Sequence, residues 1–190
     1  MIRIIDPSGY RTSGWPGGKT TELYIYPEDA SYSGRNFDFR ISTATVETEE
    51  SAFTKLEGVR RQLAVLEGEM KLVFNGGREI SLKPYEVCAF DGGWDTRSYG
   101  KVKDFNLMVA RGNGTLAVRS VPGTYEGLYS GGKRFLYCPA GDICVKSGNE
   151  SYFLKAGYTL LLEEEAAGTV FIIENRAGTG LKLFDIHIGG

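Results

Sequence analysis

The feature that most constrains the fold is a hairpin pattern within residues 63–93. Met70 to Phe74 and Glu79 to Leu82 alternate apolar and polar side chains on either side of Asn75-Gly76-Gly77. Alternation with a period of two is typical of a half-buried strand, and Asn-Gly turns accept the positive φ that tight hairpins need. The segment therefore predicts one hairpin of a β-barrel of the kind that often holds a metal ion.

Strand-like segments of this kind recur along the whole chain, which predicts an all-β protein. No segment shows a convincing helical period longer than about two turns. Gly-rich turns separate the segments, as expected for many short strands. Besides the hairpin, we expect strands at residues 23–26, 37–46, 61–66, 85–90, 105–111, 115–121, 133–138, 143–146, 152–154, 158–162, 169–174 and 181–188.

An internal similarity suggests two tandem β-barrels packed as one compact unit. Residues 82–87 (LKPYEV) and 154–160 (LKAGYTL) both have the form Leu-Lys, turn, Tyr, strand. Two related barrels would produce this repeat, and chance similarity between two hairpins is the alternative. With the boundary near Gly112 to Thr115, the sequence predicts barrels at 1–114 and 115–190.

Composition excludes several classes of partner. The net charge of −2 gives no electrostatic reason to expect nucleic acid or an anionic membrane. The start, MIRIIDPSGY, does not fit a signal peptide, and no run of roughly 18 apolar residues could span a bilayer. Three cysteines, at 88, 138 and 144, are an odd number and indicate buried core residues in a reducing compartment. We expect a cytoplasmic protein with no nucleic-acid or membrane partner.

The residues that metal and nucleophile chemistry usually need are scarce. The chain has one histidine, His187, whereas a histidine metal site needs several that converge with a carboxylate. A serine or cysteine nucleophile would have to recruit the same residue. Residues 15–20 (WPGGKT) lack the first glycine and the preceding strand of a phosphate loop. We therefore expect no metal and no cofactor.

Polar side chains on strands that otherwise bury apolar faces are the candidate site residues. Arg40 and Ser42 share a strand face, Asp104 and Asn106 share another, and Arg61 lies on a face with apolar residues. A buried arginine is costly unless it is paired. The arginines therefore either pair with carboxylates inside the protein or bind an anionic ligand. The pattern alone leaves both explanations open.

Ordered motifs along the first half resemble the HutD/Ves family of bacterial proteins, which are members of the cupin superfamily. Beyond about residue 115 the match is weak, and many members have Asp where Arg60 stands. The motifs are Trp15-Pro16-Gly17-Gly18-Lys19-Thr20-Thr21-Glu22, Phe39 to Val46, Ser51-Ala52-Phe53-Thr54, Gly58-Val59-Arg60-Arg61, Leu66-Glu67-Gly68, Phe90-Asp91-Gly92, and Asp104 to Met108 with Arg111.

The resemblance implies two cupin barrels without the usual metal-binding histidines. The family is associated with histidine utilisation, and binding of a small carboxylate intermediate of that pathway has been proposed for it. We therefore expect a non-enzymatic or regulatory binder of a small anion, such as formylglutamate, formiminoglutamate or urocanate. The expected ligand-binding residues are Arg40, Ser42, Arg61 and Asn106, with Trp15 and Phe90 lining the pocket.

Two other hypotheses remain open at this stage. A metal-independent isomerase or hydrolase could use Asp91, Glu22 or Tyr85 for acid–base chemistry if a dry pocket shifts their pKa. Alternatively, the polar residues form an internal network and the function lies in a protein–protein surface. The cupin resemblance also allows a homodimer formed through strand edges.

Overall fold

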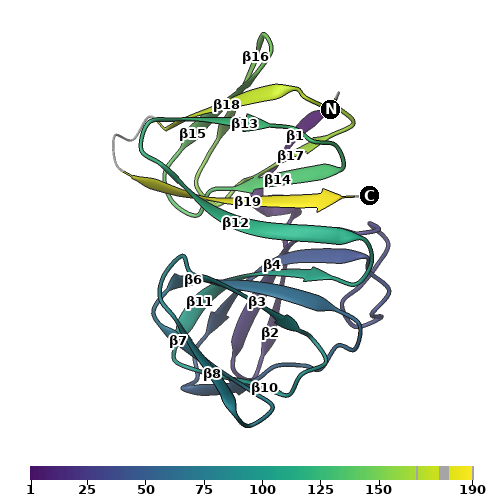
Figure 1. Ribbon diagram of the computed structural model, residues 1–190, viewed down its shortest axis with the longest axis vertical. Helices are drawn as coiled ribbons and strands as arrows, with labels where there is room; N and C mark the ends of the chain where they lie inside the picture. The colour runs from purple at the N-terminus through teal and green to yellow at the C-terminus, as the bar shows by residue number, and fades with distance from the viewer. Residues whose placement is uncertain (166, 176–179, 190) are drawn as a thin grey trace. The chain divides into compact units, whose positions relative to one another are not determined.

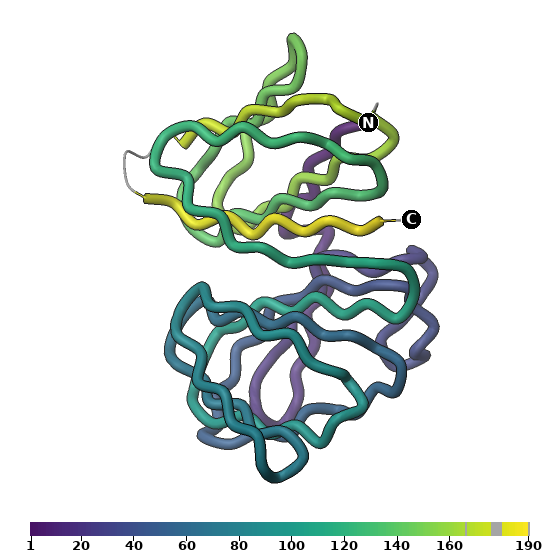
Figure 2. The backbone as a smooth tube through the Cα atoms, in the orientation of Figure 1, coloured from purple at the N-terminus to yellow at the C-terminus, as the bar shows by residue number. Residues whose placement is uncertain are grey.

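The computed structural model describes residues 1–165, 167–175 and 180–189, which form two compact units (Figure 1). The N-terminal unit is Tyr10–Gly112, and the C-terminal unit is Asn113–Gly190 together with Met1–Gly9. Strand β1 (Ile2–Ile5) pairs with β17 (Thr159–Glu163), so the first residues lie in the C-terminal unit, where Figure 2 shows them in purple. The sequence alone predicts residues 1–9 in the first barrel, because long-range strand pairing leaves no local pattern.

The N-terminal unit contains two antiparallel sheets. The six-stranded sheet has the order β2-β3-β4-β11-β6-β9, and the four-stranded sheet has the order β5-β10-β7-β8. The strands are β2 (Arg11–Trp15), β3 (Gly18–Tyr26), β4 (Phe39–Val46), β5 (Glu50–Ala52), β6 (Arg60–Glu67), β7 (Met70–Phe74), β8 (Arg78–Leu82), β9 (Val87–Asp91), β10 (Thr96–Tyr99) and β11 (Val102–Val109).

The C-terminal unit also contains two antiparallel sheets, with the orders β1-β17-β14-β19-β12 and β13-β18-β15-β16. A short 3-10 helix, η1 (Pro7–Gly9), follows β1. In the described residues no helix is long and apolar enough to cross a membrane. The strands are β12 (Asn113–Val121), β13 (Thr124–Leu128), β14 (Lys133–Tyr137), β15 (Ile143–Ser147), β16 (Glu150–Leu154), β17 (Thr159–Glu163), β18 (Val170–Asn175) and β19 (Leu181–Gly189).

The two units repeat one topology. The strands β4-β11-β6-β9 of the first unit correspond to β12-β19-β14-β17 of the second, because neighbours in the two sheets follow one another along the chain in the same order. In the same way, β5-β10-β7-β8 corresponds to β13-β18-β15-β16. The internal similarity found in the sequence lies between the corresponding strands β8–β9 and β16–β17. The prediction of tandem all-β, cupin-like units is confirmed. Each unit is a sandwich of two sheets rather than a closed barrel.

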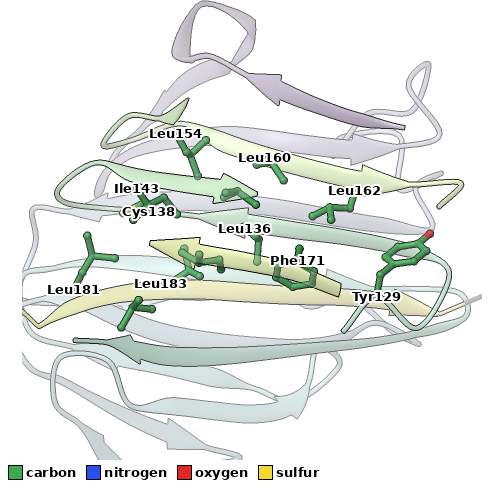
Figure 3. Packing of buried hydrophobic residues seen from close by; sticks show 13 residues of the cluster. Tyr129, Leu136, Cys138, Ile143, Leu154, Leu160, Leu162, Phe171, Leu181 and Leu183 are labelled. Atoms are coloured by element: carbon green, nitrogen blue, oxygen red, sulfur yellow. The ribbon is translucent and has the colours of Figure 1, made fainter. Parts of the chain in front are cut away.

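Apolar side chains from both sheets fill the interior of the C-terminal unit. Leu136, Leu160 and Leu183 come from the five-stranded sheet, and Leu154 and Phe171 come from the four-stranded sheet. Figure 3 shows these side chains directed toward one another between the sheets. All five are fully buried or nearly so, as expected for a close-packed sandwich core.

A matching cluster fills one end of the N-terminal unit, with Leu63 and Val65 from one sheet and Leu72 and Phe74 from the other. A second cluster, which includes Ile25, lies around Met108 of β11. Between these apolar regions the sheet carries polar side chains, and the functional candidates belong to that part of the fold.

We predict that Gly18 tolerates no side chain. Its φ is +151°, and a Cβ there would lie 1.9 Å from the carbonyl oxygen of Thr45 on the paired strand. Because backbone must move to relieve this clash, Gly18→Ala should lower the free energy of unfolding by on the order of 2 kcal/mol or more. Urea denaturation measures this loss.

Gly14 of the neighbouring strand β2 is the matched control, because a Cβ there meets no atom within 4 Å. Gly14→Ala should change the free energy of unfolding by less than about 0.5 kcal/mol. Equal effects of the two substitutions would contradict the packing described for β3 and β4.

Candidate functional site

Three rows of side chains cross one face of the six-stranded sheet and build the site. Side chains two residues apart on a strand share a face, so consecutive rows are about 7 Å apart. Met108 lies opposite Arg40 and Arg61 in the first row, Asn106 opposite Ser42 and Leu63 in the second, and Asp104 opposite Ala44 and Val65 in the third. Glu22 of β3 extends the second row beside Ser42.

These rows form the floor of a cavity of about 280 Å³ in the N-terminal unit. The edge strand β2, the segment around Tyr32 and the segment that follows β5 supply the remaining walls. The lining residues are Ser13, Gly14, Trp15, Thr20, Tyr32, Arg40, Ser42, Ala44, Val46, Ser51, Ala52, Phe53, Thr54, Arg61, Asp104, Asn106 and Met108.

Arg40 is neutralised inside the protein. Its Nε donates to Glu22 Oε2 at 2.6 Å, and its Nη1 donates to Ser42 Oγ at 3.3 Å. The guanidinium also lies 4.6 Å from the centre of the Tyr32 ring. Both members of the ion pair are largely buried, so removal of either would leave an uncompensated charge. For Arg40 the structure therefore favours internal pairing, the first of the two explanations left open by the sequence.

Arg61 has a different environment, in which aromatic rings replace a counter-ion. Its guanidinium carbon lies 4.5 Å from the Phe53 ring centre and 5.4 Å from that of Phe90. The buried Nε has no hydrogen-bond partner, and among the described residues no carboxylate forms an ion pair with Arg61. Burial lowers the pKa of Arg61 to about 10, although Tyr32 and Asp104 act in the opposite direction. A buried cation without a partner is the charge that an anion would compensate.

Asp104 places a carboxyl group in the same cavity. The residue is only 3% exposed, and burial raises the pKa of its carboxyl group to about 7, with the positive charge of Arg61 acting against this rise. Within the part of the chain that the structure describes, no hydrogen bond to its carboxylate is found. Asp104 is thus a buried acid that changes its charge near neutral pH.

Asn106 lies in the second row, between the row of Arg61 and the row of Asp104. Asn106 is 6% exposed, and its buried Oδ1 has no hydrogen-bond partner among the residues that the structure describes. An unpaired buried acceptor costs about 1–3 kcal/mol. A ligand that satisfied it would recover that cost.

The C-terminal unit shows the same arginine position with a different neighbour. Arg134 of β14 corresponds to Arg61 of β6, and Asp185 of β19 corresponds to Asn106 of β11, as the shared strand register shows. Arg134 donates from Nε to Asp185 Oδ1 at 2.8 Å and from Nη2 to Oδ2 at 2.7 Å. Its guanidinium also lies 4.6 Å from the centre of the Phe171 ring. One unit therefore neutralises its arginine internally, and the other does not.

Five of the six predicted ligand-binding residues come together in the structure. Trp15, Arg40, Ser42, Arg61 and Asn106 all line the cavity. Phe90 does not line it, because its ring packs in the core and contacts the guanidinium of Arg61. Whether any of these residues binds a ligand stays a prediction.

The three residues named for acid–base chemistry do not converge. Glu22 lies beside the cavity, but its carboxylate is held by Arg40. Asp91 is exposed and accepts a hydrogen bond from the backbone N–H of Gly93 at 2.7 Å. Tyr85 lies in the turn between β8 and β9, where its φ is 72°, and is not among the lining residues.

Sequence reasoning missed two site residues, Tyr32 and Phe53. It singled out Asp104 as a polar residue on the strand face of Asn106 but did not include it among the expected ligand-binding residues. Tyr32 and Phe53 lie outside the regular strands, where no periodicity marks which side chains turn inward. Across the described residues no group of three His, Cys, Asp or Glu side chains could hold a metal ion.

Comparisons with known proteins place these observations in a family. The family model HutD matches residues 8–178. No curated protein sequence matches the chain. A conserved protein of unknown function from Pseudomonas aeruginosa PAO1 has 22% identity and a TM-score of 0.89, with 100% of both chains covered.

Two further solved structures share the fold. HutD from Pseudomonas fluorescens SBW25, determined in a formate condition, has 22% identity and a TM-score of 0.77 with full coverage of both chains. YhhW from Escherichia coli has 9% identity and a TM-score of 0.73, covering 100% of this chain and 98% of its own. At these identities the likeness concerns the fold alone.

The raised pKa of Asp104 predicts a pH-dependent effect of Asp104→Asn on stability. The native state holds its proton up to about pH 7, whereas the unfolded chain loses it near the ordinary value of 3.8. The contribution of Asp104 to the free energy of unfolding is therefore fully present below pH 3.8. It falls as the pH rises toward 7 and stays low above that. The neutral, isosteric asparagine avoids the loss.

Differential scanning calorimetry of both proteins between pH 5 and pH 8 checks this prediction. The melting temperature of Asp104→Asn should exceed that of the wild type by at least about 4 °C at pH 8. The gain should be smaller at pH 5 and should level off above about pH 7. A gain that does not depend on pH would show that Asp104 is not the titrating group.

Proposed function

The chain belongs to the HutD family, and we propose that its N-terminal unit binds a small metabolite that carries a carboxylate. One observation carries this proposal: Arg61 is buried in a cavity wall without an ion pair among the described residues. Guanidinium groups recognise carboxylates through paired hydrogen bonds, and such a contact would replace the missing counter-ion.

The C-terminal unit supports this proposal because it supplies the compensated version of the same position. There the Asp185 carboxylate engages Arg134 through two hydrogen bonds of 2.7 and 2.8 Å. The corresponding residue in the N-terminal unit is Asn106, which carries no charge. A ligand carboxylate beside Arg61 would perform the role that Asp185 performs inside the protein.

The size of the cavity limits the ligand to a small molecule. A volume of about 280 Å³ lies below the roughly 300–1,000 Å³ of pockets that take drug-sized ligands. Formylglutamate, formiminoglutamate and urocanate are all small acids that meet this limit. A link to histidine utilisation belongs to the same proposal, and its support is membership of the HutD family.

Acid–base catalysis is the second candidate function, and Asp104 is the observation that favours it. A buried carboxyl group with a pKa of about 7 at a cavity wall can both give and accept a proton at neutral pH. Incubation of a bound ligand with the protein, followed by NMR, would detect turnover. Conversion that is lost in Asp104→Asn would favour the enzyme, and unchanged ligand would favour the binder.

A thermal-shift screen against histidine-pathway acids and simple dicarboxylates tests the binding proposal. A ligand present at about 100 times its dissociation constant adds roughly 2.7 kcal/mol of stability. For a chain of this length this corresponds to about 5–11 °C in melting temperature. Arg61→Met should abolish the shift, because it removes the guanidinium and keeps an apolar side chain beside the aromatic rings.

The matched control is Arg60→Met at the adjacent position of β6. Arg60 is exposed and donates to the backbone oxygen of Gly112 outside the cavity, so its loss should leave the shift intact. A shift that survives in Arg61→Met, or that disappears equally in both variants, would rule out Arg61 as the anion-binding group.

Asn106→Asp should weaken ligand binding, because the new carboxylate would neutralise Arg61 inside the protein. The substitution recreates the arginine–aspartate arrangement of the C-terminal unit, in which the carboxylate at this position neutralises the arginine. We expect the affinity for a carboxylate ligand at pH 8 to fall at least about 10-fold, because the internal carboxylate competes for Arg61 and repels the ligand. Isothermal titration calorimetry measures this change, and unaltered affinity would contradict the comparison between the two units.

A further inference from the structure

We propose that Asp104 and Asn106 form a hydrogen-bond-accepting subsite next to Arg61, so that the ligand is a carboxylate that also carries an N–H donor. This inference rests on the proposed function, because it assumes that the ligand carboxylate binds Arg61. Beyond that function, it assigns the recognition of an N–H donor to Asp104 and Asn106.

The first observation is the lack of donors for two buried acceptors on one strand face. Asn106 Oδ1 is buried, and it has no hydrogen-bond partner among the described residues. Asp104 lies two residues away on β11, and only 3% of it is exposed. Both residues line the cavity. At both residues β11 pairs with β4 on one side and with β6 on the other, so these side chains do not lie at an open strand edge.

The second observation is that neither arginine of the cavity donates to these two acceptors. Arg40 donates to Glu22 and to Ser42. Arg61 lies two rows from Asp104, and its guanidinium packs beside the rings of Phe53 and Phe90. No donor within the described residues therefore satisfies either acceptor.

A ligand with both groups would satisfy both ends of the cavity. Its carboxylate would compensate Arg61, and its N–H would donate to Asp104, to Asn106 Oδ1 or to both. Sites built to hydrogen-bond an N–H or O–H group discriminate strongly against analogues that lack it, because the buried acceptors would stay unpaired. An acid without a donor would leave an ionised Asp104 facing its own negative charge.

Charge balance then makes the recognition depend on pH. The charged and titratable groups that face the cavity are Asp104 of β11, Arg61 of β6, Arg40 of β4 with its partner Glu22 of β3, and Tyr32. The carboxylates of simple acids, with a pKa of about 4, are largely ionised at pH 5.5 and fully ionised at pH 8. Preference for the N–H ligand should be strongest where Asp104 is ionised and should weaken where it is protonated.

Matched probe pairs test the subsite directly. One series is N-acetylglycine, N-acetyl-β-alanine and N-acetyl-4-aminobutyrate, in which the carboxylate and the N–H are separated by one to three carbons. The partner series consists of the acetoxy acids of the same lengths, in which an ester oxygen replaces the N–H. Affinities of the full-length protein are measured by NMR titration at pH 8 and pH 5.5, with glutarate as an acid that has no donor.

The expected result is that at least one N-acetyl acid binds at least about 10-fold more tightly than its acetoxy partner at pH 8. The ratio should shrink at pH 5.5. It should also shrink at pH 8 in Asp104→Asn, whereas Asp95→Asn, the same substitution at an exposed aspartate outside the cavity, should keep the wild-type ratio. Cooperative unfolding of both variants confirms that they are folded.

Each other outcome overturns a defined part of the argument. Equal binding of the two series together with clear binding of glutarate would overturn the donor subsite and leave the anion site at Arg61 standing. Absence of binding by every carboxylate would overturn the proposed function and this inference together. An N–H preference that persists unchanged in Asp104→Asn would remove Asp104 from the subsite.

Discussion

The buried positive charge of Arg61 is the constraint on which the organisation of the N-terminal unit depends. A guanidinium buried beside Phe53 and Phe90 loses most of its hydration, and the lowered pKa of about 10 reflects this cost. Proteins normally offset such a cost with a carboxylate in direct contact. Here the nearby carboxyl group belongs to Asp104, which lies two rows away and is itself forced toward the neutral form by burial. The unit thus keeps a charge that its own residues do not neutralise.

The repeated topology allows Arg61 to be compared with an arginine at the corresponding position of the second unit. Both units place an arginine on corresponding strands, β6 and β14, with an aromatic ring against the guanidinium. In the C-terminal unit Asp185 completes the pair and apolar side chains fill the interior, whereas the N-terminal unit has Asn106 at that position and a cavity of about 280 Å³. Fold alone therefore does not explain the lack of a counter-ion. The difference lies in a single carboxylate, which the proposed ligand would supply from outside.

Local patterns in the sequence predicted the strands that alternate strongly, but not those defined by distant partners. The hairpin of β7 and β8 was predicted within one residue, because Asn75 and Gly76 adopt the positive φ of its turn. Strands β1, β2, β5, β10 and β13 were missed, since they are short or carry polar and Gly residues and form through pairing with distant strands. The site followed the same rule. Arg61 and Asn106 stood out on regular strands, whereas the pairing of Arg40 with Glu22 required the register of β3 against β4.

The cavity also combines two ionisable groups whose charges respond differently to pH. Arg61, with a pKa of about 10, stays positive across the physiological range, whereas Asp104, with a pKa of about 7, changes from neutral to negative within it. Because Arg40 and Glu22 cancel one another, the uncompensated charge of the cavity is set by these two residues. Below neutral pH Asp104 is protonated, so the cavity carries the net positive charge of Arg61, which attracts small acids. Above neutral pH Asp104 is ionised, so the cavity has a positive end at Arg61 and a negative end at Asp104. A dipole with a fixed positive end and an accepting end selects the orientation of its ligand as well as its charge.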